Sequence, residues 1–482
     1  MKKFVFLFLG FFSVVFAQEL ILSSVIKIYK TGEVYNYSTP WAAPRHVDSS
    51  GSGCIIENNR ILTNAHVVDG AVYLELKKAN NPRRYAAKVE HINHAFDLAI
   101  ITPLEDEFFE NTTALRLGEL PLVQDTVLAC GYPAGGNELA ITKGQVSRIE
   151  YMEYVHSQAY LLACQIDAPT NPGNSGGPIL SLDGSILGIA MQSNPDLQNT
   201  GHMVPVTLIK NFLITIDQQK QNTLIEPGIH YQKMIHSDLK QAFGLLHYNT
   251  GILITRIELM SCFFPYLQPR DILLEIDHVP ILDDGSIQFR KTEFLPFLHL
   301  IKEKRIHDSI HLKILRSGQV EDLLVPLTHD LFNQELIPSN KPTTPPSYFV
   351  YAGLVFQPLD LNYIQTGLMR ELKQLSKLLK YVDKYQSDKK KQVVLLSKVL
   401  SHTSTKGYHD IRHEEVTKIN GYAIDELKDV PKAFENNPHF FHIIETKSGL
   451  QCILNAQESL QAHFDILKQY HIHQDRSDDL LD

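Results

Sequence analysis

The stretch Asn171-Pro-Gly-Asn-Ser-Gly-Gly-Pro178 is the most informative part of this chain of 482 residues. A nucleophilic serine needs its Oγ exposed on a tight turn, with backbone N–H groups directed at the oxyanion that develops on the substrate. Gly173 allows a turn in which its N–H and that of Ser175 point the same way, and the two glycines after the serine leave room for a substrate. An ordinary Gly- and Ser-rich turn would explain Gly-Asn-Ser alone but not the eight-residue context. The stretch therefore predicts a nucleophilic Ser175 with an oxyanion hole formed by the N–H groups of Gly173 and Ser175.

Two further stretches supply partners for this serine. In Leu62-Thr-Asn-Ala-His-Val-Val68, a histidine follows a strand-like run, which is where a base that takes the serine proton is needed. In Ala95-Phe-Asp-Leu-Ala-Ile-Ile101, an aspartate precedes an apolar strand, and a carboxylate there must be hydrogen-bonded, for example to a histidine Nδ1–H. Either motif alone has a structural explanation, as a core histidine or as a turn-capping aspartate. Together they predict a triad of His66, Asp97 and Ser175, in the chain order of chymotrypsin-type proteases.

The region that contains these motifs is rich in short apolar runs separated by Gly, Pro, Asn and Asp. Many short strands with regular turn signals predict an all-β sandwich or barrel. The strands expected between residues 20 and 216 include Ser24–Tyr29, Gly53–Ile56, Val72–Leu76, Leu98–Ile101, Thr126–Gly131 and Ile186–Met191, with one helix at Val206–Ile216.

Composition narrows the class of protein. Apolar residues make up 44% and charged residues 21% of the chain, which is typical of a globular protein and not of a disordered one. The net charge of −9 argues against a nucleic-acid-binding protein, which needs a basic surface to meet phosphates. Five cysteines are too few for a disulfide scaffold, and most are expected to be buried and unpaired. The 22 histidines give the chain a charge that changes sign in mild acid.

The first residues have the pattern of a secretory signal peptide. Lys2 and Lys3 precede an apolar run from Phe4 to Phe16, and cleavage is expected after Ala17. The run is shorter than the roughly 20 residues that span a bilayer as a helix. An uncleaved anchor or a buried strand is the alternative. The pattern predicts an exported, periplasmic protein.

Beyond residue 217 strands and helices mix, in two segments of about 100 residues separated by a Pro-rich stretch, Pro338–Ser347. Both segments contain a strand, a two-residue turn and a short strand, centred on Asp277-His278 and on Asn420-Gly421. Strands are also expected at Gly251–Ile257, Asp271–Ile276, Ile310–Leu315, Gln392–Leu400 and Glu414–Ile419, helices at Thr292–Lys304 and Tyr363–Lys380, and a loose acidic tail from Asp475 to Asp482.

The motifs TNAHVV, FDLAII and NPGNSGGP resemble those of the HtrA/Deg serine proteases, at His66, Asp97 and Ser175. The resemblance covers most of the chain, is specific in the protease and weak in the last 130 residues. Asn36–Trp41, Val146–Glu150 and Tyr348–Leu359 look most similar to the branch found in plant organelles, which has a divergent second PDZ domain.

This resemblance implies a mainly β protein with α+β modules, a chymotrypsin-like double β-barrel protease followed by two PDZ-like domains. The expected division is a signal peptide (1–17), a protease domain (18–222), a first PDZ domain (223–337), a linker (338–347), a second PDZ-like domain (348–474) and an acidic tail (475–482). It further implies ATP-independent hydrolysis of unfolded or damaged proteins in protein quality control and stress response, with no metal or other cofactor. Homo-oligomers built from trimers are expected. The loops around the oxyanion hole are expected to rearrange on activation.

Binding subsites follow from the same resemblance. Thr170, Met191, Gln192 and Ser193 would line the S1 pocket, and because none is acidic, small to medium apolar P1 residues are expected. C-terminal or apolar peptides would add a strand to the first PDZ domain at Gly228, Ile229, His230 and Tyr231, although these residues could equally well only begin a strand.

Two other functions remain open at this point. The first is a chaperone or adaptor that uses a protease fold with low or regulated activity. The second is metal binding by the closely spaced pairs His91 and His94 or His471 and His473, neither of which has the Cys or carboxylate neighbours of a firm site.

Overall fold

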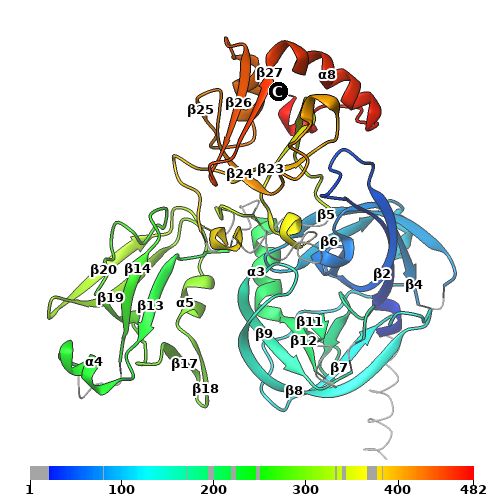
Figure 1. Ribbon diagram of the computed structural model, residues 1–482. Helices are drawn as coiled ribbons and strands as arrows, with labels where there is room; N and C mark the ends of the chain where they lie inside the picture. Colours follow the sequence, from blue (N-terminus) through cyan, green and yellow to red (C-terminus); the bar gives the residue numbers. More distant parts are fainter. Residues whose placement is uncertain are drawn as a thin grey trace, which may run out of the picture. The chain divides into compact units, whose positions relative to one another are not determined.

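The computed structural model describes residues 21–79, 81–169, 171–193, 200–218, 224–245, 250–331, 334–338, 343–365, 377–382 and 384–481 (Figure 1). Contacts divide the chain into two units. The first contains residues up to Gly32 and His46–Asp330, and the second contains Glu33–Arg45 and Leu331–Asp482. The signal-peptide prediction falls on residues outside the described part.

The first unit begins with a closed six-stranded barrel. Its strands follow the order β1-β2-β3-β6-β5-β4, all antiparallel. Apolar side chains such as Ile28, Leu76 and Ile101 fill its interior. The strands are β1 Val25–Val34, β2 Arg45–Ile56, β3 Arg60–Thr63, β4 Ala71–Lys78, β5 Arg84–Asn93 and β6 Leu98–Pro103.

A second closed barrel follows, in the order β10-β11-β12-β9-β8-β7. Its core contains Val127, Ile166 and Ile179, and helix α3 (Val206–Asp217) comes after its last strand. The strands are β7 Thr126–Gly131, β8 Ala140–Glu153, β9 Tyr160–Ile166, β10 Pro178–Leu180, β11 Ile186–Ser193 and β12 Gly201–Pro205. The two barrels confirm the predicted chymotrypsin-like architecture, and α3 confirms the predicted helix.

The first unit ends in a smaller antiparallel sheet of order β13-β14-β15-β19-β20, with β16 paired to β15 and a separate hairpin, β17-β18. Its core extends into the protease, because Tyr151 of β8 and Leu162 of β9 pack in the same cluster as Phe297 and Ile301. The elements are β13 Ile229–Lys233, α4 Ser237–Ala242, β14 Ile252–Ile257, β15 Ile272–Ile276, β16 Val279–Pro280, β17 Ser286–Arg290, β18 Glu293–Pro296, α5 Leu298–Lys302, β19 Ser309–Arg316 and β20 Gln319–Pro326.

The second unit contains a seven-stranded sheet of order β21-β22-β23-β24-β26-β27, with β25 paired to β24. The segment Glu33–Arg45, between β1 and β2, also belongs to this unit, and its Tyr37 lies in an apolar cluster with Leu359 and Tyr363. The elements are β21 Phe349–Tyr351, β22 Leu354–Pro358, β23 Val394–Val399, β24 Glu414–Ile419, β25 Tyr422–Ala423, α7 Asp429–Glu435, β26 Phe441–Thr446, β27 Gln451–Asn455 and α8 Ala456–Gln469.

The repeated hairpin is confirmed in both sheets. Asp277 and His278 turn between β15 and β16 with φ of 47° and 65°, and Asn420 and Gly421 turn between β24 and β25 with φ of 51° and 81°. Positive φ at both central residues is the geometry of the tight turn that joins two twisted antiparallel strands.

Two predictions about local structure need correction, and one more is largely untested. The first half of the expected helix Thr292–Lys304 is strand β18, because it pairs with β17, and only Leu298–Lys302 is α-helical. The expected helix Tyr363–Lys380 falls largely on residues outside the described part. The acidic tail is not loose, because Ser477 N donates to Tyr348 O (3.0 Å) and Val350 N donates to Asp475 O (2.6 Å), which fixes the tail to β21.

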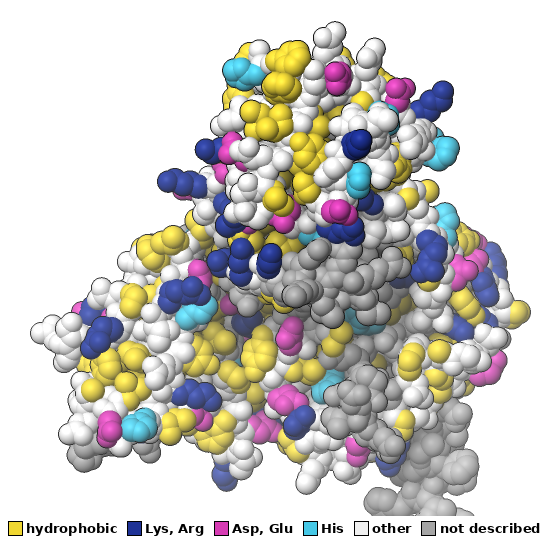
Figure 2. All heavy atoms as spheres, in the orientation of Figure 1, with side chains coloured by type: hydrophobic (Ala, Val, Ile, Leu, Met, Phe, Trp, Pro, Cys, Tyr) yellow, Lys and Arg dark blue, Asp and Glu magenta, His cyan; other side chains and the backbone are white. Residues whose placement is uncertain are grey.

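All five cysteines are buried free thiols. Among the described helices, none combines the length and the apolar character that crossing a membrane requires. On the face shown in Figure 2, basic and acidic side chains are interspersed.

Candidate active site

The first barrel holds His66 and Asp97 in direct contact. His66 lies in the short helix α2 (Ala65–Val68), directly after β3, and Asp97 precedes β6, which pairs with β3. The His66 Nδ1 atom is 2.8 Å from Asp97 Oδ2 and 3.0 Å from Oδ1, and the backbone N of His66 donates to Oδ1 at 2.9 Å. An imidazole held this way presents its other nitrogen, Nε2, as the proton acceptor.

The carboxylate of Asp97 is almost completely enclosed, with 1% of the residue exposed. Its backbone adopts a φ of 53°, in the left-handed region, and its carbonyl accepts a hydrogen bond from Asn64 Nδ2 at 2.8 Å. Asn64 of the TNAHVV motif therefore holds the turn that directs Asp97 towards His66.

Ser175 comes from the second barrel, in the loop before β10. Its Oγ donates to Met191 O at 3.2 Å. The loop is fixed from both sides, since Gly176 N donates to Ala190 O and Ser52 N donates to Ser175 O, both at 2.9 Å. The hydroxyl is thus on a rigid turn, oriented towards β11.

The orientation of the peptide between Pro172 and Gly173 is fixed by a hydrogen bond. Ala134 N donates to Pro172 O at 2.6 Å, and because C=O and N–H of a trans peptide point in opposite directions, the N–H of Gly173 points away from Ala134. Within the described part of the chain, neither Gly173 N nor Ser175 N has a hydrogen-bond partner. Gly173 has a φ of 96°, and a Cβ there would lie 2.5 Å from Tyr132 O, so only glycine fits.

Comparison with known proteins agrees with this geometry. Residues 51–189 match the model of the trypsin-like peptidase domain, and residues 337–479 match that of a PDZ domain. The chain is 34% identical over 86% of its length to "Protease Do-like 4, mitochondrial" of Arabidopsis thaliana, of which it covers 77%. It is 33% identical over 96% of its length to "Protease Do-like 2, chloroplastic" of the same plant, of which it covers 76%.

The chain belongs to the Do-like (HtrA/Deg) protease family. It is a serine endopeptidase with a trypsin-like peptidase domain and a PDZ domain. "Serine protease DegP homolog" of Plasmodium falciparum is also similar, at 27% identity over 89% of this chain and 61% of that protein. Among solved structures, "HtrA-type protease AlgW with decapeptide" has a TM-score of 0.51 at 24% identity, covering 65% of this chain and 97% of that one, which shows a shared fold.

The comparisons overturn the predicted periplasmic location. Several of the similar Do-like proteases are mitochondrial or chloroplastic by name. Two lysines followed by an apolar run were too general a pattern to identify the compartment. The prediction of an exported, periplasmic enzyme is therefore wrong.

Two further residues of this Do-like protease contact the candidate site, and neither was assigned to it from the sequence. The first is Ser52, which lies within β2. Its Oγ donates to Gly173 O (2.7 Å) and accepts from Tyr132 N (2.8 Å), so it ties the Ser175 loop to the end of β7. The Ser50-Gly-Ser-Gly motif was the available signal.

The second is His156, at the tip of the β8–β9 hairpin. Its ring is stacked on that of His66, with centroids 3.9 Å apart and planes 11° apart. The turn is held by Tyr154, whose backbone N donates to Ala159 O at 2.9 Å. Burial lowers the pKa of His156, and the nearby His66 lowers it further while Asp97 opposes the shift. No sequence motif marks this residue, because the contact depends on how the hairpin folds back over the first barrel.

The structure describes only some of the residues expected to line the S1 pocket. The Met191 side chain is buried, and its carbonyl is the acceptor for Ser175 Oγ. Gln192 and Ser193 continue β11, whereas Thr170 lies outside the described residues.

The expected peptide groove lies at a sheet edge. Ile229, His230 and Tyr231 are in β13, an outermost strand that pairs on one side with β14, and Gly228 precedes it with a φ of 62°. His230 Nε2 lies 2.6 Å from Glu258 Oε1, and the ring of Tyr231 packs edge-on against Phe297. An edge strand is the element to which a peptide can add.

In the part of the chain that the structure describes, no group of three or more His, Cys, Asp or Glu side chains is placed to hold a metal ion. The pair His91 and His94 does not extend into such a group, and neither does His471 with His473.

Proposed function

We propose that this Do-like protease cleaves peptide bonds through an acyl-enzyme formed on Ser175. His66 takes the Ser175 proton and returns it to the leaving amine, while Asp97 fixes the imidazole tautomer and stabilises the imidazolium. The N–H groups of Gly173 and Ser175 bind the oxyanion of the tetrahedral intermediate. The observation that carries the proposal is the 2.8 Å contact between His66 Nδ1 and Asp97 Oδ2, beside a loop with two N–H groups that have no partner among the described residues.

The Ser175 rotamer defines the first step. Its Oγ is hydrogen-bonded to Met191 O, so a rotation about χ1 towards His66 Nε2 precedes attack. Such a rotation moves between staggered wells and needs no backbone change.

The substrates we propose are unfolded or damaged polypeptides, cleaved without ATP as part of protein quality control. The S1 pocket would accept small to medium apolar side chains, because no acidic residue is among Met191, Gln192 and Ser193. A cleavage profile dominated by Lys or Arg at P1 would contradict this specificity.

Peptide segments would be recruited by strand addition along β13, with Gly228 at the entrance of the groove, and the PDZ domain of residues 337–479 would serve recruitment or assembly. This proposal also includes the predicted boundaries of the six segments of the chain. It includes a first PDZ domain at 223–337 and assembly into trimers.

The alternative, a chaperone or adaptor with little proteolysis, is separated by one experiment. Casein degradation is measured for the assembled wild type and for Ser175→Ala, with Ser181→Ala in the exposed β10–β11 turn as the matched control. We expect degradation by the wild type and the control only. Equal degradation by Ser175→Ala would exclude Ser175 as nucleophile, and no degradation by any of the three would favour the chaperone.

A further inference from the structure

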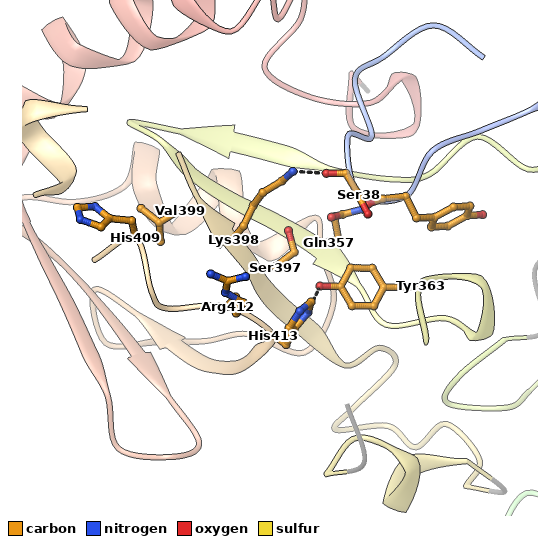
Figure 3. A pocket seen from close by; sticks show the side chains of 10 residues that line it. Ser38, Gln357, Tyr363, Ser397, Lys398, Val399, His409, Arg412 and His413 are labelled. Carbon is orange, nitrogen blue, oxygen red and sulfur yellow. Dashed lines mark hydrogen bonds between the residues drawn. The ribbon is translucent and has the colours of Figure 1, made fainter. Parts of the chain in front are cut away.

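A cavity of about 290 Å³ lies in the second unit, between β22, β23, the loop before β24 and the segment Glu33–Arg45 (Figure 3). Four of the residues that line it have basic side chains, Lys398, His409, Arg412 and His413. None of its described lining residues is acidic. The cavity is near the lower end of the size range of small-molecule sites.

Lys398 contributes a positive charge to this cavity and has no counter-ion among the described residues. The residue is half-buried on β23, its Nζ donates to Ser38 O, and it lies 5.1 Å from the centre of the Trp41 ring. No described carboxylate pairs with it. Burial lowers the pKa of Lys398, which is the response expected of an ammonium group that lacks a charged partner.

Gln357 adds an unused acceptor. It lies on β22 with 2% of its surface exposed, and its Nε2 donates to Tyr37 O at 3.1 Å. Its Oε1 is buried and has no hydrogen-bond partner among the residues that the structure describes. Buried polar atoms are rarely left unpaired, so this oxygen can accept a hydrogen bond from a bound molecule.

The topology excludes a peptide that adds a strand here. β22 pairs with β21 and β23, and β23 pairs with β22 and β24, so both strands are inside the sheet. A ligand must therefore fit within the cavity and use side-chain groups.

We propose that this cavity binds a small organic anion that carries an O–H donor beside its carboxylate, such as a hydroxydicarboxylic acid. The anionic group pairs with Lys398, Arg412 on the rim adds a second cation, and the hydroxyl donates to Gln357 Oε1. This site is independent of the catalytic residues and of the proposed PDZ groove on β13.

The test is calorimetric titration of the full-length chain carrying Ser175→Ala, which prevents self-digestion. The probes are L-malate and succinate, which have the same charge and differ by one hydroxyl. We expect L-malate to bind about tenfold more tightly than succinate, since one well-formed hydrogen bond to a buried acceptor has this effect. Equal affinities in the wild-type cavity, or no binding of either probe, would overturn the proposal.

Substitutions in the cavity test whether the probes bind there. Lys398→Met is expected to weaken both probes at least about tenfold, since it removes a charge-assisted contact, and Lys432→Met on exposed α7 is the matched control. Gln357→Leu is expected to remove the preference for L-malate. Because Gln357 is buried, its variant is paired with Arg412→Gln on the exposed rim, which is expected to weaken both probes. Unchanged affinities in Lys398→Met and Arg412→Gln would place any observed binding elsewhere and refute the assignment.

Discussion

The two halves of the candidate active site differ in how far they are prepared for reaction. In the first barrel, His66 and Asp97 share three close contacts and Asp97 is enclosed. In the second barrel, the Ser175 backbone is fixed, but its hydroxyl is bonded to Met191 O. In the proposed mechanism, this difference means that the base is preorganised and that the nucleophile is engaged last. Substitutions in each half should therefore have separable effects.

The largest effect is expected from Asp97→Asn. The Asn amide places an N–H group against His66 Nδ1, which favours the tautomer with its proton on Nε2, so the base can no longer accept from Ser175. We expect kcat to fall about 10⁴-fold with KM little changed. Peptide hydrolysis measures this, with Asp183→Asn in the exposed β10–β11 turn as control. A decrease in kcat of less than tenfold would mean that the His66–Asp97 pair does not act as the general base.

In the second-barrel half, Gly173→Ala should remove one oxyanion donor. The added Cβ would lie 2.5 Å from Tyr132 O and 2.6 Å from Ala134 N, and a φ of 96° is strained for alanine, so the peptide must shift. We expect kcat to fall about 10²- to 10³-fold. Gly135→Ala, in the β7–β8 loop with no atom within 4 Å of its Cβ, is the control for backbone strain alone. Equal losses in both variants would contradict the role of Gly173.

A smaller effect is expected at His156, whose ring contacts the first-barrel half from the second barrel. His156→Ala removes the stacked ring and allows the His66 imidazole more freedom, so we expect kcat to fall about two- to tenfold, the value of one aromatic contact. His156→Phe keeps a ring and should stay close to the wild type. A rise in kcat/KM for His156→Ala would show instead that the ring obstructs the cleft.

The prediction with the smallest effect at neutral pH concerns His299 and the stability of the first unit in acid. His299 is buried, its Nδ1 is 3.0 Å from the Tyr151 hydroxyl, and burial lowers its pKa to about 4. A histidine with a depressed pKa is neutral in the folded state, so above pH 6.5 it does not reduce the free energy of unfolding. As the pH falls towards 4, the unfolded state binds the proton more readily, and the folded state is progressively destabilised. The cost by pH 4 is about 3 kcal/mol.

Thermal unfolding between pH 7.5 and 4.5 measures this loss. His299→Asn keeps a polar group near Tyr151 without the titration, so its midpoint should fall less steeply with acid, whereas exposed His439→Asn should follow the wild type. Identical slopes for all three proteins would exclude His299. The two halves of the site are best compared above pH 6.5, where this loss does not contribute.

The sequence predicted the parts of the molecule that local patterns determine. The order His66, Asp97, Ser175 and the glycines around the serine follow from chemistry at fixed spacing. The short apolar runs predicted an all-β sandwich or barrel, and the family resemblance predicted two barrels. The repeated two-residue turns at Asp277 and Asn420 were visible because tight hairpins demand particular residues.

Contacts between distant segments were not predictable in this way. His156 meets His66 only after the β8–β9 hairpin folds against the other barrel, and Ser52 acts through the backbone of a loop more than a hundred residues away. Strand β18 was taken for a helix because its pairing with β17 overrides local propensity. The tail after Asp475 looked loose because composition does not reveal its bonds to Tyr348 and Val350.

The most direct test of the account is covalent labelling by a fluorophosphonate, followed by peptide mapping of the modified chain. A base that is preorganised and a serine that needs only a side-chain rotation predict one adduct per chain, on the peptide that contains Ser175. Labelling should be lost in Ser175→Ala and strongly slowed in Asp97→Asn. An adduct on any other residue, or labelling that persists at the wild-type rate in Asp97→Asn, would contradict the assignment of His66, Asp97 and Ser175 as the catalytic unit.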